Sequence, residues 1–239
     1  MFFVLPVIPL LAVYILAAVL PAAFLLRYIY RQDTVEKEPL GLLVTLLLLG
    51  VAAALISGVL ERLAQTVLQM LIDPGSPAYT ILLAFLVVAL VEEGTKFCLL
   101  KGRTWEHPAF NYRFDGIVYA VFVSLGFAAF ENIQYVLHYG LSVALSRAFL
   151  AVPGHMSFAV YMGLFYGRAK LCAACGDERG MRRNWLAGYL SAVFLHGVYD
   201  SCAMIGSVPS TLLFIVFILL MYRGVYRLLK RESAADMPV

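Results

Sequence analysis

Two adjacent glutamates, Glu92 and Glu93, stand in an apolar run of helical length, and Lys96 follows one turn later. A charged side chain inside a membrane helix costs roughly 2.5–3.5 kcal/mol on insertion scales, so such a group is usually functional. Glu92 and Lys96 are four residues apart and share a helix face, so we expect Lys96 to hold Glu92 ionised and oriented. Glu93 points about 100° away, and we expect it to face elsewhere. The alternative is a surface acidic pair at a helix end.

Further ionisable groups follow in three later apolar stretches: Glu131, then His155 directly after a Pro-Gly pair, then His196 and Asp200 spaced i,i+4. Carboxylates and imidazoles together suit activation of a water molecule, with a carboxylate taking the proton. The histidines either hold a metal or donate to a developing oxyanion. Read as metal ligands, His155, His196 and Glu131 form a catalytic set suited to a divalent ion, zinc in the first place.

Each group also has a plainer interpretation. Glu131 can mark the outer boundary of a membrane span, and a single buried histidine is often a structural hydrogen-bonding group. The chain has no HExxH sequence, no serine nucleophile motif and no phosphate-binding loop. The concentration of polar groups in consecutive apolar stretches favours a functional site.

The elements that must position these residues are membrane helices. Hydrophobic residues make up 62% of the 239 residues and charged residues 14%, against about 45–50% and 25% in soluble domains. This composition predicts an all-α, polytopic membrane protein and leaves no room for a large soluble domain. The net charge of +3 is small and does not indicate a nucleic-acid partner. The first apolar run has no evident cleavage site, so we interpret it as a retained span.

Apolar stretches of spanning length predict seven transmembrane helices in one integral membrane domain, residues 1–239, with the catalytic helices within residues 78–205. The predicted spans are Val4–Leu26, Leu40–Leu60, Ala78–Leu100, Phe114–Leu137, Leu145–Tyr166, Trp185–Ile205 and Pro209–Leu229. Between the second and third spans, Glu61–Asp73 has apolar residues at helical spacing and is predicted as a short interfacial helix.

The distribution of Lys and Arg predicts the orientation. Fifteen of the eighteen lie in alternate connections and in the C-terminal tail, and the other three connections hold only Arg62 and Arg147. The positive-inside rule therefore places the N-terminus outside and the C-terminus in the cytoplasm. In this orientation Glu131 and His155 lie in the outer halves of their spans, on the order of 10 Å from the level of Glu92. Helix tilt, a shift of the third span or a break at Gly154 would bring them together; otherwise they form two sites.

The chain has four cysteines, of which Cys172 and Cys175 form a CxxC sequence in a basic connection. With no second such pair and no histidine pair beside it, we interpret these as reduced cysteines in a cytoplasmic loop; metal binding or redox chemistry is the alternative.

The residues resemble those of a known family. Glu92-Glu93-Gly94-Thr95-Lys96 is similar to the EExxK motif of the PrsW intramembrane proteases, and Phe127–Asn132 to their FxxxEN motif. His155 and the stretch His196–Asp200 resemble their two later histidine motifs, and the four occur in the expected order. The type II CAAX prenyl endopeptidases are distant relatives, but here the basic residue is a lysine at another spacing and Glu131 stands where they carry histidine.

The resemblance implies a bacterial protease, multi-pass in the inner membrane, that cuts a membrane-anchored protein of the anti-sigma-factor type near its outer side. It also implies roles. Glu92 would be the leading general base and Glu93 catalytic or orienting, with Lys96 as charge partner. His155 and His196 would be ligands or oxyanion donors, and the carboxylates Glu131 and Asp200 would support or ligate. Its partners would be that substrate and the lipid bilayer.

Two other classes remain open from the residues alone. Buried carboxylates and histidines also serve proton relays, which indicates an ion- or proton-coupled transporter as the alternative. The chain lacks the internal repeat on which many transporters are built. The third possibility, a non-catalytic adaptor, fits less well with intact polar residues at all four motifs.

Overall fold

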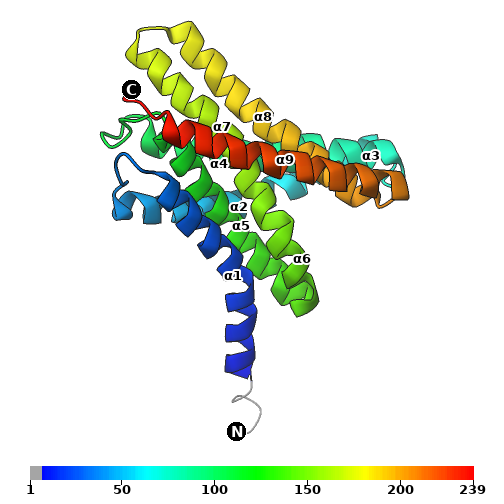
Figure 1. The fold of residues 1–239 in the computed structure, drawn as a ribbon. Helices are drawn as coiled ribbons and strands as arrows, with labels where there is room; N and C mark the ends of the chain where they lie inside the picture. Colours follow the sequence, from blue (N-terminus) through cyan, green and yellow to red (C-terminus); the bar gives the residue numbers. More distant parts are fainter. Residues whose placement is uncertain (1–6) are drawn as a thin grey trace.

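The structure is a computed structural model that describes residues 7–239, and within them it is helical throughout, without a β-strand (Figure 1). The elements are α1 (Val7–Gln32), α2 (Leu40–Leu71), α3 (Pro77–Leu82), η1 (Leu83–Ala89), α4 (Leu90–Thr104), α5 (Asp115–Tyr139), η2 (Leu141–Val143), α6 (Ala144–Phe149), α7 (Ala151–Ala174), α8 (Glu178–Ile205) and α9 (Val208–Ala234). The predicted all-α class is confirmed. The beginning of the first predicted span, residues 4–6, lies outside the described residues.

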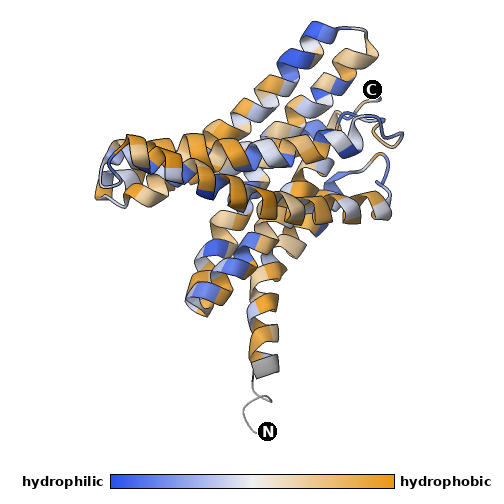
Figure 2. Ribbon diagram, turned by 180° about the vertical axis from the view of Figure 1, so that it is seen from behind, coloured by the Kyte–Doolittle hydropathy of each residue, from blue (hydrophilic) through white to orange (hydrophobic). Residues whose placement is uncertain are grey.

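Within the described residues, five stretches are long and apolar enough to cross a membrane, and hydrophobic residues predominate along the helices in Figure 2. They are Pro9–Gln32, Leu40–Leu71, Asp115–Tyr139, Leu141–Ala174 and Val208–Ala234. The two other predicted spans correspond to α3–η1–α4 and to α8. The first of these carries Glu92, Glu93 and Lys96, and α8 carries His196 and Asp200. These polar groups lower the mean hydropathy of both helices, so neither is among the five.

Helix α5 lies at the centre, between α1, α2 and α7, and all of its first fourteen residues are buried. Glycines allow the backbones to approach. A Cβ on Gly126 would meet the backbone of Leu47 in α2, and one on Gly163 in α7 would meet the backbone of Gly116. Small residues at membrane helix crossings permit such contacts. Gly126 thus allows α5 to approach α2 closely.

Helix α2 is longer than its predicted span. It continues without a break from Leu40 to Leu71, so the expectation of a separate interfacial helix at Glu61–Asp73 was wrong. No glycine or proline interrupts residues 59–71, and the helix ends only before Asp73-Pro74-Gly75. The extension carries Glu61 toward the centre of the molecule, where it lines the main cavity.

The fifth predicted span consists of two helices, α6 and α7, which meet at Leu150. Pro153 has no backbone N–H, and its ring conflicts with a helical carbonyl four residues earlier, that of Phe149. The Tyr222 hydroxyl of α9 donates to the carbonyls of Phe149 and Leu150, at 3.2 and 2.9 Å. The break thus precedes His155, which lies in regular helix, and the freed carbonyl of Phe149 has a partner in Tyr222.

The helices diverge at one side of the molecule (Figure 1). Helix α1 and helix α6 extend in one direction, while α3 and the adjoining ends of α8 and α9 extend in another. Just before the glutamate pair, η1 is a π-helix over Leu83–Ala89, a wider turn that is frequent at functional sites. The site lies where these two arms join.

Candidate active site

Lys96 is at the centre of a buried network. Its Nζ lies 3.0 Å from Glu92 Oε2, 2.8 Å from Glu93 Oε1 and 3.3 Å from His155 Nδ1. The ammonium also lies 3.8 Å from the centroid of the Phe127 ring. The predicted pairing with Glu92 is present. Glu93 also contacts Lys96, which was not expected, because positions three and four residues away both neighbour a lysine on a helix surface.

His155 lies between Lys96 and Glu131. Its Nδ1 faces the lysine ammonium, and its Nε2 lies 3.0 Å from Glu131 Oε2. An ammonium can only donate, so Nδ1 accepts from it and the ring proton is on Nε2, which donates to Glu131. The Nδ1 lone pair therefore points toward the glutamate pair.

His196 lies between two carboxylates. Its Nδ1 is 3.0 Å from Glu93 Oε1 and its Nε2 is 3.3 Å from Asp200 Oδ2. The ring is stacked on Phe158 at 4.8 Å between centroids. A Cβ on the following residue, Gly197, would meet the ring of Phe85 in η1. The glycine lets α8 approach the helix of the glutamates closely enough for these contacts.

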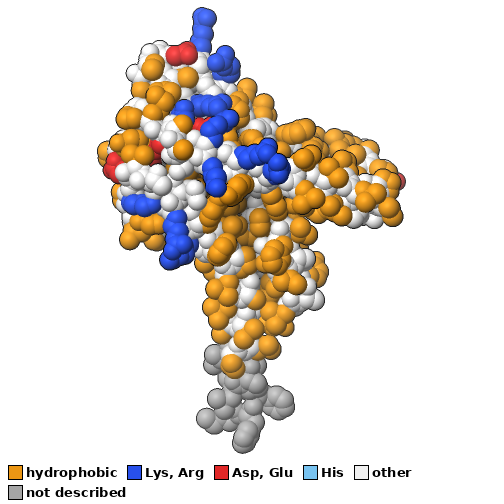
Figure 3. Space-filling model, viewed as in Figure 1, with side chains coloured by type: hydrophobic (Ala, Val, Ile, Leu, Met, Phe, Trp, Pro, Cys, Tyr) orange, Lys and Arg blue, Asp and Glu red, His pale blue; other side chains and the backbone are white. Residues whose placement is uncertain are grey.

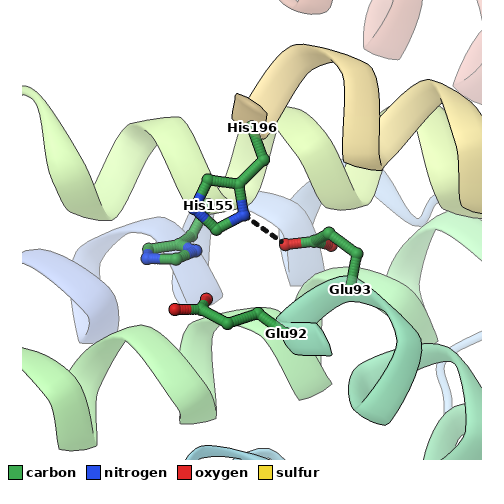
Figure 4. Close-up of side chains that lie close together, drawn as sticks. All are labelled: Glu92, Glu93, His155 and His196. Carbon is green, nitrogen blue, oxygen red and sulfur yellow. Dashed lines mark hydrogen bonds and ion pairs between the residues drawn. The ribbon is translucent and has the colours of Figure 1, made fainter. Parts of the chain in front are cut away.

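All seven predicted site residues thus belong to one network, and the predicted difference in depth is absent. The helix that carries Glu92 runs from Pro77 to Thr104 through η1, so the glutamates are near its middle and not at its inner end. One ligand atom from each of Glu92, Glu93, His155 and His196 lies within 4.8 Å of the others. Figure 4 shows these four side chains converging from α4, α7 and α8.

A cavity of about 440 Å³ opens beside this network. Its walls include the site residues Glu92, Glu131, His155, His196 and Asp200, but Glu93 and Lys96 are not among the lining residues. The side chain of Glu93 is 1% exposed. The pair therefore divides by position: Glu92 faces the cavity and Glu93 lies behind it.

Two further ionisable residues at the cavity were not predicted. Glu61 reaches it because α2 is longer than its predicted span. Arg147 lies in α6, and its Nη2 is 2.8 Å from Glu131 Oε2. The sequence contained a signal for Arg147, since it is one of only two cations in the connections that are predicted to lie outside.

Comparison with known proteins agrees with this site. The sequence profile of the PrsW family of intramembrane metalloproteases matches residues 38–223, most of the chain and all of the site. The chain belongs to the PrsW family. It is similar to Protease PrsW of Geobacillus kaustophilus, with 40% identity over 77% of this chain and 76% of the relative. Protease PrsW of Halalkalibacterium halodurans is 32% identical over 92% of this chain and 97% of the relative. No solved structure matches the chain.

Membership of the PrsW family makes the chain a membrane-embedded peptidase that acts on a protein. The family is one of metalloproteases, and the residues here fit a metal ion. Nitrogen and oxygen donors are those that zinc takes in catalytic sites. Glu93 Oε2 is buried without a hydrogen-bond partner in the described part of the chain. At the site, five carboxylates stand against two permanent cations, Lys96 and Arg147.

The two cysteines of the CxxC sequence are far along the chain from this PrsW site. Cys172 lies in the last turn of α7, about five turns after His155, and Cys175 directly follows the helix. Both are free thiols, partly or fully exposed. The structure gives them no contact with the residues of the network.

Proposed function

We propose that this protein hydrolyses a peptide bond in a membrane-anchored protein substrate with a water molecule activated by Glu92. The observation that carries the proposal is the position of Glu92, the member of the glutamate pair that lines the cavity. A carboxylate there is within reach of both a water molecule and a peptide carbonyl. It takes a proton from the water and later gives it to the leaving amine.

Lys96 and Glu93 support this step from behind. The ammonium donates to both carboxylates, at 3.0 and 2.8 Å, and so fixes the direction of the Glu92 side chain. Glu93 accepts from Lys96 and faces His196 Nδ1 at 3.0 Å. His196 is at the cavity wall with Asp200 on its other nitrogen. Asp200 thus orients the His196 ring so that its Nδ1 faces the glutamate pair.

A divalent metal, zinc in the first place, would be held by Glu93, His155 and His196. This set leaves Glu92 free as the base. It differs from the set predicted from the sequence, which had Glu131 in place of Glu93. Glu131 contacts Nε2 of His155, the nitrogen that faces away from the glutamate pair. When bound, the ion supplies Lewis-acid activation of the water and the carbonyl. His155 Nδ1 carries no proton and accepts from Lys96, so it would bind the ion in exchange for that contact.

The orientation of the site in the membrane follows from charge. Lys and Arg side chains gather at the end of the molecule that holds the α7–α8 connection and the C-terminus (Figure 3). We assign this end to the cytoplasm and the N-terminus to the outside of the bacterial inner membrane. In this assignment the chain is a single domain of seven spans, with the catalytic helices within residues 78–205. Ser146 and Arg147, from the opposite connection, line the cavity. A substrate of the anti-sigma-factor type would then be cut near its outer side.

Cleavage of a co-expressed single-pass protein of that type, tagged at its cytoplasmic end, tests the proposal. We expect Glu92→Gln to abolish the product while the enzyme stays in the membrane, because an amide cannot accept the proton of water. Glu93→Gln and His196→Ala should each reduce cleavage strongly. Glu178→Gln is the matched control, since that carboxylate is 78% exposed at the beginning of α8. Product formation by Glu92→Gln at the level of this control would refute the assignment of the base.

A further inference from the structure

Arg147 is held by three residues from a single turn of α5. Its Nη2 donates to Glu131 Oε2 at 2.8 Å, and its Nε donates to Asn132 Oδ1 at 2.9 Å. The guanidinium carbon lies 3.8 Å from the centroid of the Tyr135 ring. The planar guanidinium satisfies these contacts together because its donors have a fixed geometry. A point charge such as a lysine ammonium has no such arrangement.

The orientation of Asn132 is set from the other side. Its Nδ2 donates to the carbonyl of Ala18 in α1 at 2.7 Å, and the residue is fully buried. The amide nitrogen is therefore used, and only the amide oxygen faces Arg147. Helices α1, α5 and α6 are joined at this point by two hydrogen bonds to one amide.

The same oxygen of Glu131 that accepts from Arg147 also faces the catalytic histidine. Oε2 is 2.8 Å from Arg147 Nη2 and 3.0 Å from His155 Nε2. We propose that Arg147 is a positioning residue that holds the Glu131 carboxylate in place. The fixed carboxylate keeps the proton of His155 on Nε2, and the Nδ1 lone pair of His155 then points toward Lys96 and the glutamate pair. A histidine bound to a metal commonly has such a carboxylate on its other nitrogen.

The contacts distinguish this role from two others. A residue that served only to bind substrate would not direct two of its three nitrogens to Asn132 and Glu131, as Arg147 does. A residue that only fastens α6 would not need to share an oxygen atom with His155. The inference rests on the proposed function, because it concerns the geometry of the same site.

Steady-state cleavage by Arg147→Gln and Arg147→Lys tests the role, with Arg62→Gln as the matched control. Arg62 is the other outer cation and lies exposed on α2. We expect Arg147→Gln to lower kcat about 10- to 100-fold, the usual effect of losing an outer partner of a ligand, with KM nearly unchanged. Arg147→Lys keeps the charge but can reach only one of the two acceptors, Glu131 and Asn132. Its kcat should therefore lie between that of the wild type and that of Arg147→Gln.

A second measurement is zinc affinity, determined by competition with a chelating dye. We expect Arg147→Gln to weaken binding about 10- to 100-fold, and to have no further effect in a Glu131→Gln background, because Arg147 acts through that carboxylate. Additive losses would overturn the proposal. A raised KM at unchanged kcat, or a kcat equal to that of Arg62→Gln, would overturn it as well.

These outcomes are separable from failure of the proposed function. If the wild-type protein cleaves its substrate but binds no zinc, the metal assignment fails and kcat alone decides the role of Arg147. If Glu92→Gln cleaves normally while Arg147→Gln is impaired in kcat, the base is wrong and the positioning role stands. If Arg147→Gln does not fold, Arg147→Lys decides: a kcat at the wild-type value would overturn the inference.

Discussion

Replacing Lys96 by methionine is the most informative test of how the site is held together. Methionine has a similar length and volume but no charge. In the wild-type protein the ammonium lies within 3.0 Å of two carboxylates, from Glu92 and Glu93, whose residues are 6% and 0% exposed. After the replacement both carboxylates remain in the same apolar surroundings without their common cation.

The magnitude follows from the burial of the pair. Removing one partner of a buried ion pair typically costs about 3–5 kcal/mol, because an uncompensated charge stays behind. By the scale for soluble proteins of this length, that corresponds to a decrease in Tm of roughly 6–20 °C. His196 still faces Glu93 at 3.0 Å. The carboxylate that loses most is therefore Glu92, and its neutralisation should recover much of the loss.

Thermal unfolding in mild detergent, followed by the soluble fraction of a fluorescent fusion, measures the effect. We expect Lys96→Met to lower Tm by that amount and Lys96→Met/Glu92→Gln to lie clearly above it. The control is Lys230→Met, which removes an exposed cation at the end of α9. Equal Tm values for Lys96→Met and the control would refute the reasoning. So would a double variant that is less stable than Lys96→Met alone, because the two charges would then not be coupled.

Three further predictions concern other parts of the molecule. Burial raises the pKa of Glu38, in the α1–α2 connection, from 4.5 to about 7, so its contribution to stability is lost as the pH rises from about 4.5 to 7. Glu38→Gln should therefore flatten the change in Tm between pH 5 and 8 relative to the wild type. Gly163→Ala puts a methyl group against the backbone of α5 and should cost about 1–3 kcal/mol of unfolding free energy, whereas Gly41→Ala, with open space around it, should be neutral. In a cysteine-free background, Glu61→Cys should react with a water-soluble thiol reagent applied from outside, and Leu60→Cys, exposed on the apolar surface next to it, should not.

Much of the site could be predicted from the sequence because each polar group stands out against an apolar helix. Glu92, Glu131, His155 and His196 each belong to a different apolar stretch. The structure brings all four together at the cavity. Periodicity within one helix also predicted the contact between Lys96 and Glu92. What a sequence shows directly is which residues are costly to bury.

Helix ends were predicted less well, with consequences for the site. Hydropathy ended the second span at Leu60, but a helix ends where its backbone hydrogen bonds end, and α2 continues to Leu71. Glu61 was therefore placed at a membrane surface and not at the cavity. The predicted difference in depth between Glu92 and Glu131 had the same origin, because the third predicted span lacked the C-terminal end of α4.

The contacts between helices could not be predicted from periodicity at all. That Glu93 reaches His196, and that Arg147 reaches Glu131, depends on crossings set by glycines and by the break at Leu150. Small residues mark where helices can approach, but they do not specify which helices do so. Composition thus predicts the chemistry of the site, whereas its pairing requires the structure.

The pairing shows that the site is one electrostatic unit. Donors and acceptors alternate along a single chain of contacts between 2.8 and 3.3 Å. Its members, in order, are Arg147, Glu131, His155, Lys96, Glu93, His196 and Asp200. Each group is a partner for the next, so none is a buried charge on its own, and the cost of burial falls on the network as a whole. Glu92 branches from this chain at Lys96 toward the cavity, which leaves it the carboxylate with one fixed partner and one side open to water.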